Sequence, residues 1–259
     1  QIHFHLSGKA ETERSLVGFY FADKAPERAL INVDAPALFA FGKGLDIAPG
    51  AKQSIEDSVV LPVDVRAYGV TAHAHYLGKD MLVTAQLPGG ALKTLIHIKE
   101  WEFHWQQNYR YLTPIALPAG TTISLKYTFD NSDENPENPN HPPVRVQFGP
   151  NSTDEMAELG LQFLTQSAPD AERIFSDFNQ RADKSNLELA EKQVRDAPNN
   201  PEHLEFLGSL YLAQGRTAEA ITLLERALRL NDKTADAHND LGNALMAQNR
   251  LNEALTHFR

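Results

Sequence analysis

Hydrophobic and polar positions alternate along much of the first 165 residues. Alternating runs occur at 59–63, 66–74, 82–86, 94–98 and 122–129, and turn signals rich in glycine and proline separate them. A period of two is typical of strands that bury one face, and short strands between frequent turns favour antiparallel sheets. The pattern predicts an antiparallel sandwich or barrel, preceded by a hairpin of residues 1–8 with a strand at Ser15–Ala22. Residues 130–143, rich in Asn and Pro, are expected to form a long loop.

The pattern changes at about residue 166, where helical periodicity begins. Leu207-Gly208 recurs as Leu241-Gly242, and Glu219-Ala220 recurs as Glu253-Ala254, so the repeat is 34 residues long. This period, with small residues where paired helices approach each other, is the tetratricopeptide pattern. We expect a linker at 167–184, marked by Pro169, and tetratricopeptide repeats at 185–259 that are incomplete at the C-terminal end. The fold class is therefore mainly β followed by all-α.

Composition narrows the possible functions. The net charge of −10, the pI of about 5.4 and the absence of a Lys/Arg cluster argue against a nucleic-acid surface. The chain has no cysteine, which excludes disulfides, iron–sulfur clusters and thiolate metal sites. Any metal must be held by His, Met, Asp or Glu. No run of eighteen apolar residues is present, so we expect no membrane segment.

His73 and His75 lie two residues apart at the end of an alternating run. In a strand such residues point to the same face, so the two imidazoles would share one side of a sheet. Neutral imidazole binds Zn, Cu, Fe and Ni. An isolated His-x-His is equally compatible with two surface or cross-strand histidines. A methionine that follows a polar run, Met156 in Asn-Ser-Thr-Asp-Glu-Met, would by itself read as the start of a core strand.

Taken together, four motifs resemble the copper type II ascorbate-dependent monooxygenases, the family of peptidylglycine α-hydroxylating monooxygenase and dopamine β-monooxygenase. The motifs are His-Ala-His-Tyr-Leu-Gly-Lys at 73–79, the aromatic run at 103–111, Leu-Pro-Ala-Gly-Thr at 117–121 and Thr-Asp-Glu-Met at 153–156. Their order and spacing are similar to those of the family. The resemblance covers roughly residues 1–165.

The resemblance implies two copper ions in the intact protein. One ion, which activates oxygen, would be held by His73, His75 and Met156, and this site is complete within the chain. The second would use His3, in a strand that begins Gln1-Ile-His-Phe, with its two other ligands upstream of residue 1. His5 lies on the same face as His3 and is a neighbour rather than a ligand.

The resemblance also implies domains, reaction and location. Residues 1–34 would be the last hairpin of a truncated first β domain, and residues 35–166 a jelly-roll-like β-sandwich with the copper site. The activity would be hydroxylation of a substrate C–H bond with oxygen and ascorbate or another one-electron reductant, at a periplasmic or secreted location. The repeats would bind a protein or peptide partner.

The substrate does not follow from the resemblance. In the peptide-processing enzyme an Arg and a Tyr hold the substrate carboxylate, whereas the matching positions here are Thr71 and Gly160. Peptide amidation is therefore not expected. Two other hypotheses remain: a non-catalytic copper-binding scaffold whose repeats carry the function, and a zinc hydrolase, which a methionine ligand disfavours.

The remaining candidate residues carry less weight. We expect His97 and His104 to be packed or rim residues, and His141 to belong to the Asn- and Pro-rich loop. Asp154 and Glu155 are expected to orient the loop before Met156 through hydrogen bonds to the backbone.

Overall fold

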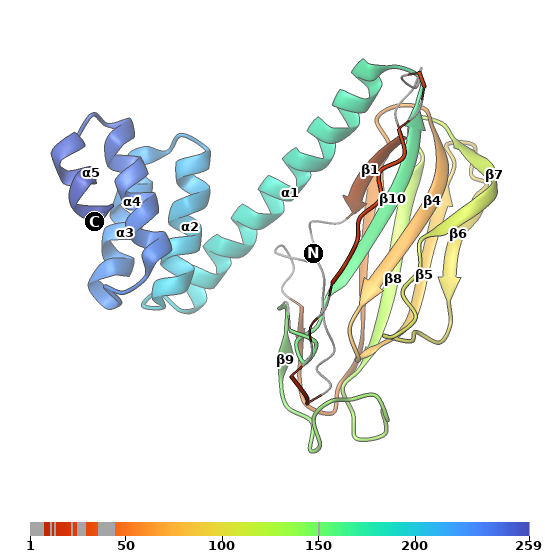
Figure 1. Cartoon of the computed structure of the whole chain (residues 1–259), viewed down its shortest axis with the longest axis horizontal. Helices are drawn as coiled ribbons and strands as arrows, with labels where there is room; N and C mark the ends of the chain where they lie inside the picture. Colours follow the sequence, from red (N-terminus) through yellow and green to blue (C-terminus); the bar gives the residue numbers. More distant parts are fainter. Residues whose placement is uncertain are drawn as a thin grey trace.

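A computed structural model describes residues 8–10, 12, 14–21, 23–24, 30–35, 45–149 and 151–258. It is mainly β up to residue 165 and helical from residue 168, as the hydrophobic pattern predicts (Figure 1). In the described part of the chain, no helix is long and apolar enough to cross a membrane.

Ten strands make up the described β region. They are β1 (Leu30–Ala35), β2 (Asp46–Ile47), β3 (Lys52–Val60), β4 (Val65–Ala74), β5 (Gly78–Gln86), β6 (Leu92–Ile98), β7 (Tyr109–Leu117), β8 (Thr122–Asp130), β9 (Val146–Gln147) and β10 (Ala157–Thr165). Two four-stranded sheets have the orders β1-β10-β4-β7 and β3-β8-β5-β6, and β2 pairs with β9. The pairings are antiparallel.

One hydrophobic core contains side chains from both four-stranded sheets. Along β10, alternate residues from Ala157 to Phe163 are buried, while the residues between them face outward. The opposing sheet contributes Val83 and Phe129, each 0% exposed. This alternation is the burial of one sheet face that the sequence pattern predicts. It leaves the outward face of β1-β10-β4-β7 free to carry polar side chains.

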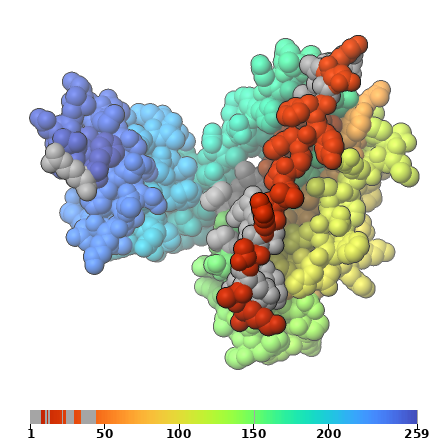
Figure 2. Space-filling model, viewed as in Figure 1, coloured from red at the N-terminus to blue at the C-terminus, as the bar shows by residue number. Residues whose placement is uncertain are grey.

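The expected strand at Ser15–Ala22 is not present. Residues 14–21 form no strand, and Leu16 and Phe21 are about nine-tenths exposed, at 91% and 90%. The physical reason is that an apolar segment forms a strand only where a partner completes its hydrogen bonds. In Figure 2 the red part of this segment lies on the surface of the β region. Residues 1–7 and Ala22 lie outside the described residues.

Residues 168–184, which we expected as part of a linker, instead form the first half of a long helix, α1 (Ala168–Asp196). Ser167 caps the helix by accepting a hydrogen bond from the Asp170 N–H, and Pro169 occupies the first turn. Proline is favoured there because its missing N–H would have no partner in any case. Ile174 is 0% exposed and belongs to the β core, so the first half of α1 packs on the sheets. Figure 1 shows α1 running from the β region to the other helices.

The remaining helices pack in sequence against one another. They are α2 (Pro201–Ala213), α3 (Thr217–Leu230), α4 (Ala235–Ala247) and α5 (Leu251–His257). A Cβ on Gly208 would lie 2.8 Å from Leu224 Cγ, and one on Gly242 would lie 2.5 Å from the Phe258 ring. The repeated glycines therefore permit the close approach of the paired helices.

We expect Ile174→Ala to destabilise the β region by about 2–5 kcal/mol, because it removes a fully buried side chain from a shared core. Phe175→Ala is the matched control: the neighbouring side chain is larger but 41% exposed, and its loss should cost less than about 1 kcal/mol. Chemical unfolding followed by tryptophan fluorescence measures the difference, since both tryptophans, Trp101 and Trp105, lie in the β region. Equal effects of the two changes would contradict the docking of α1 on the sheets.

Candidate metal centre

His73 lies on β4 and His75 follows its last residue. The centres of the two imidazole rings are 5.2 Å apart, and the rings are nearly perpendicular, with an interplanar angle of 83°. His73 is partly exposed, whereas His75 is only 4% exposed. The two histidines therefore form a close pair, as their spacing on a strand predicts.

Both imidazoles have their Nδ1 atoms engaged. His73 Nδ1 lies 2.6 Å from Gln106 Oε1, and His75 Nδ1 lies 3.1 Å from the Asp154 carbonyl oxygen. These partners are acceptors, so each Nδ1 carries the proton, and the lone pair of each Nε2 is left to bind a metal. Burial lowers the pKa of His75, which favours the neutral form that a metal requires.

Met156 and His75 lie just beyond the end of the β4–β10 ladder. The ladder pairs His73 with Glu158 and ends at the pair Ala74 and Ala157. Met156 precedes Ala157 and His75 follows Ala74, so they are the next residues on the two paired segments. The three ligands expected from the sequence are thus carried by two neighbouring segments.

Within the described ranges, no group of three or more His, Asp or Glu side chains is placed to hold a metal ion. The third ligand that the sequence predicts, Met156, has a thioether sulfur and so does not belong to such a group. A thioether is a soft ligand, and together with two imidazoles it suits copper. The donor set of this chain therefore fits a copper ion.

Glu155 directly precedes Met156 in the sequence, contacts the backbone of His75, and is 0% exposed. Its Oε1 accepts hydrogen bonds from the backbone N–H groups of His75 and Met156, and its Oε2 accepts one from Leu77 at 2.8 Å. Burial raises the pKa of Glu155 to about 7 despite these bonds. Among the described residues it has no ion-pair partner. A buried carboxylate without a cation is costly, so a metal ion held by its neighbours would supply a favourable charge.

The loop between β6 and β7 contacts both histidines. The buried Trp101 donates its Nε1–H to the His75 carbonyl at 3.0 Å, and the Phe103 ring meets the His75 ring edge-on at 5.6 Å. Gln106 holds His73, as described above. This single loop therefore fixes both the backbone and the rings of the pair. Gly78 makes room for it, because a Cβ there would lie 2.9 Å from the Trp101 ring.

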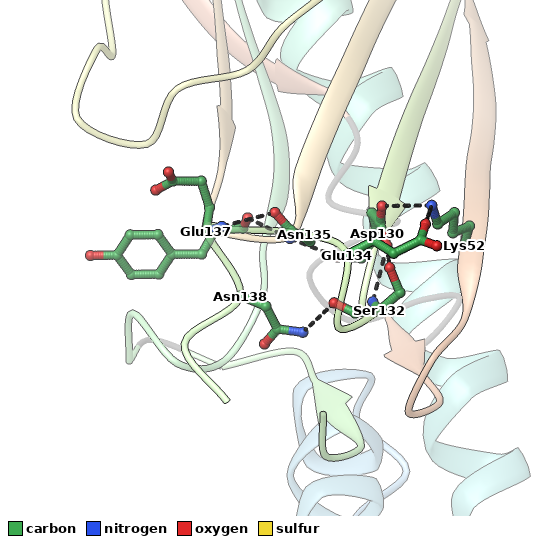
Figure 3. Close-up of polar contacts among 8 residues, drawn as sticks. Lys52, Asp130, Ser132, Glu134, Asn135, Glu137 and Asn138 are labelled. Atoms are coloured by element: carbon green, nitrogen blue, oxygen red, sulfur yellow. Dashed lines mark hydrogen bonds and ion pairs between the residues drawn. The ribbon is translucent and has the colours of Figure 1, made fainter. Parts of the chain in front are cut away.

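A second loop, residues 130–143, contacts the turn after His75, because Asn135 Nδ2 donates to the Tyr76 carbonyl at 3.4 Å. Figure 3 shows the polar contacts within this loop. Asn135 donates its Nδ2–H to the Asp130 carbonyl at 2.8 Å, and the Asp130 N–H donates to the Leu77 carbonyl at 2.8 Å. Asn138 is 3% exposed and donates to Asn131 Oδ1 at 3.0 Å. The loop is thus held in place by hydrogen bonds of its buried asparagine side chains, and not by a cluster of apolar side chains.

A cavity of about 310 Å³ lies beside His73 on the outward face of the sheet. Thr71 and Gly160 are directly paired across the β4–β10 ladder and both line it. The other lining residues are mostly polar: Asn32, Asp34, His73, Asn108, Glu158, Leu161 and Gln162.

The other candidates lie apart from this centre or outside the described residues. His97 Nε2 lies 2.9 Å from Asp80 Oδ2, and His141 lies 3.6 Å from Asp133. His104 contacts Phe103 on the rim, with ring centres 5.5 Å apart. Gln1, His3 and His5 lie outside the described residues, so the second copper site stays a prediction. Trp101 and Gln106 were not identified individually from the sequence, because their roles depend on how the loop folds back.

The tetratricopeptide repeat family matches residues 185–259. This match confirms the prediction from the 34-residue period, and this part of the chain consists of tetratricopeptide repeats. None of the curated proteins compared with the chain matches it.

Among solved structures, the crystal structure of MamA is 25% identical, with a TM-score of 0.28. The match covers 36% of this chain and 52% of MamA, so the chain spans about half of that protein. The infectious bursal disease virus Gx strain structure is 9% identical, with a TM-score of 0.28, over 59% of this chain and 37% of that chain. Neither likeness bears on the metal centre.

We expect Gln106→Leu to weaken metal binding by about 10–100-fold, because it removes the acceptor that fixes the tautomer and orientation of His73. Titration of the metal-free protein with copper against a competing chelator measures the affinity. Gln107→Leu is the matched control, since the adjacent glutamine is exposed and touches neither histidine by a hydrogen bond. An unchanged affinity in Gln106→Leu would show that His73 needs no such support.

Proposed function

We propose that this protein is a copper-dependent monooxygenase that hydroxylates a C–H bond of an organic substrate, with oxygen and an ascorbate-like one-electron reductant. In this proposal the β region is the jelly-roll-like sandwich of the copper type II monooxygenases. The observation that supports the proposal is the histidine pair with a hydrogen-bond partner at each Nδ1 atom, at the end of the ladder beyond which Met156 is the next residue of the neighbouring segment.

Copper bound by His73, His75 and Met156 would supply one-electron chemistry that couples the reduction of oxygen to the oxidation of a C–H bond. The protein's own residues define its surroundings. The two imidazoles suit both copper oxidation states, and the thioether favours Cu(I). Asp154 and Gln106 keep both histidines in the tautomer that presents Nε2.

The cavity beside His73 is the place where this proposal puts the substrate. It adjoins a ligand, and its polar side chains can orient a substrate by hydrogen bonds. Neither Thr71 nor Gly160 has a cationic side chain, so these two positions would not bind a carboxylate group of the substrate. A second, electron-donating copper would use His3, with Gln1 in the same strand and further ligands outside the chain.

The tetratricopeptide repeats indicate protein interaction, and we propose that they bind a protein or peptide partner. Arrays of this kind present an extended concave surface to their partners. Because α1 packs on both the β core and α2, a partner bound to the repeats would be connected to the β region through a packed helix. We propose a periplasmic or secreted location, as the resemblance implies.

One alternative is a copper-binding scaffold without catalytic activity. The missing clamp at Thr71 and Gly160 favours it, because a lost substrate contact is compatible with lost catalysis. In that case the metal would stabilise the β region and the repeats would carry the function.

We expect the intact protein to bind copper and to consume oxygen when a reductant such as ascorbate and a suitable substrate are supplied. His73→Ala should remove one copper ion and abolish that consumption, because it deletes one of three ligands. His97→Ala is the matched control, since this histidine pairs with Asp80 away from the centre. Metal analysis and an oxygen electrode give the two readouts.

The outcomes separate the two hypotheses. Copper that is lost in His73→Ala without any oxygen consumption by the parent protein would favour the scaffold. Copper stoichiometry that does not change in His73→Ala would contradict both.

A further inference from the structure

Glu155 has two properties that are rarely combined. It is fully buried, and both of its carboxylate oxygens are occupied by backbone N–H groups rather than by a cationic side chain. Three of the N–H groups belong to the turn after β4, at His75, Leu77 and Gly78, and one belongs to Met156 at the start of β10. The burial of this carboxylate calls for a structural explanation, because transferring a charged group from water to the protein interior costs free energy.

We propose that Glu155 is the positioning residue of the metal centre: its carboxylate ties the turn that carries His75 to the segment that carries Met156, so that the methionine and the histidines are already in place before copper binds. This inference rests on the proposed copper site and adds the group that assembles it. Glu155 itself does not bind the metal.

The geometry explains why a connection is needed at this point. The β4–β10 ladder ends at the pair Ala74 and Ala157. His75 and Met156 lie one residue beyond it, where no ladder hydrogen bond holds the two backbones together. The Glu155 carboxylate replaces the missing ladder bond, because one oxygen accepts from the N–H groups of both residues. The ligands on either side of the centre thus share one acceptor.

A carboxylate suits this position better than any other side chain. Four N–H groups converge on two oxygens, and a glutamine would present its own N–H groups to at least some of these donors. An aspartate is one methylene shorter and could not reach both segments from the same backbone. A copper ion held by the neighbouring ligands would also balance the negative charge.

Copper K-edge X-ray absorption of the Cu(I)-loaded full chain tests the inference. The parent protein should show copper–sulfur scattering from Met156, and Glu155→Gln should lose it while nitrogen scattering from the histidines remains. Cu(I) affinity in Glu155→Gln should fall by about 10–100-fold. Glu100→Gln is the matched control, because it makes the same charge change at an exposed glutamate and should leave the scattering intact.

A double-mutant cycle with Met156→Leu separates positioning from general damage to the fold. If Glu155 acts by holding Met156, Glu155→Gln should have little further effect on Cu(I) affinity once Met156 is leucine. A full and additive loss in the double variant would overturn the inference. So would copper–sulfur scattering that persists in Glu155→Gln.

Amide hydrogen exchange of the metal-free parent protein tests the same inference without any substitution, and so remains decisive if Glu155→Gln fails to fold. The N–H groups of His75, Leu77 and Met156 should be protected at least tenfold more than exposed loop amides of this region. Fast exchange at these amides before copper is added would show that the metal assembles the site. A parent protein that binds no copper would instead refute the proposed function, whereas protection of these amides would still support the connection by Glu155.

Discussion

The arrangement of the candidate metal centre depends on one buried carboxylate. Glu155 lies where the β4–β10 ladder ends, and its oxygens accept hydrogen bonds from backbone groups on both sides of the gap. Gln106 and Trp101 hold one side of the centre each, through His73 and the His75 carbonyl. The Asp154 carbonyl also crosses the gap, but it accepts only from the His75 ring, whereas Glu155 joins the two backbones.

The repeats are joined to the β region by one continuous helix that packs on both. The first half of α1 buries Ile174 in the β core, and its second half buries Ala190. Because this helix of 29 residues packs at both ends, it fixes the orientation of the repeats relative to the β region as well as the distance between them. A linker of the kind we expected would have left the repeats free to rotate.

Sequence periodicity predicted those parts of the structure that are governed by local, repeated burial. The strands near 66–74, 82–86, 94–98 and 122–129, the long loop at 130–143 and the repeats at 185–259 agree with the prediction, because alternation and the 34-residue period are direct consequences of which faces are buried. By contrast, β3 begins at Lys52, well before the predicted run at 59–63, and β7 matches none of the predicted runs. Errors arose where a local signal has two meanings. Taken alone, Pro169 indicates a linker, but with Ser167 before it the same residue lies in the first turn of a helix. Ser15–Phe21 has the composition of a strand, yet a strand also needs a partner.

In the candidate metal centre, too, the features set by adjacent residues could be predicted, whereas those that need a distant partner could not. The pair His73 and His75 was recognised from its spacing, and Glu155 from its place before Met156, because both follow from adjacent residues. Gln106 was not recognised, because its contact with His73 spans 33 residues and arises only when the loop folds back. Hydrogen-bond partners that fix a tautomer leave no periodic signal in a sequence, so they become visible only in the folded chain.

The position of the centre at the end of a ladder has a consequence for the substrate. Inside a ladder, neighbouring side chains are held about 5 Å apart and cannot converge on one ion without long side chains. Beyond the last pair, His75 and Met156 are released from that spacing, while His73 stays on the strand. The next outward-facing pair along the ladder is Thr71 with Gly160, at the cavity. The ligands are thus at the edge and the cavity lies one step inward, so a substrate in the cavity would approach the metal from the His73 side. Under the proposed function, a change at Thr71 or Gly160 would therefore alter which substrate is held without disturbing the ligands.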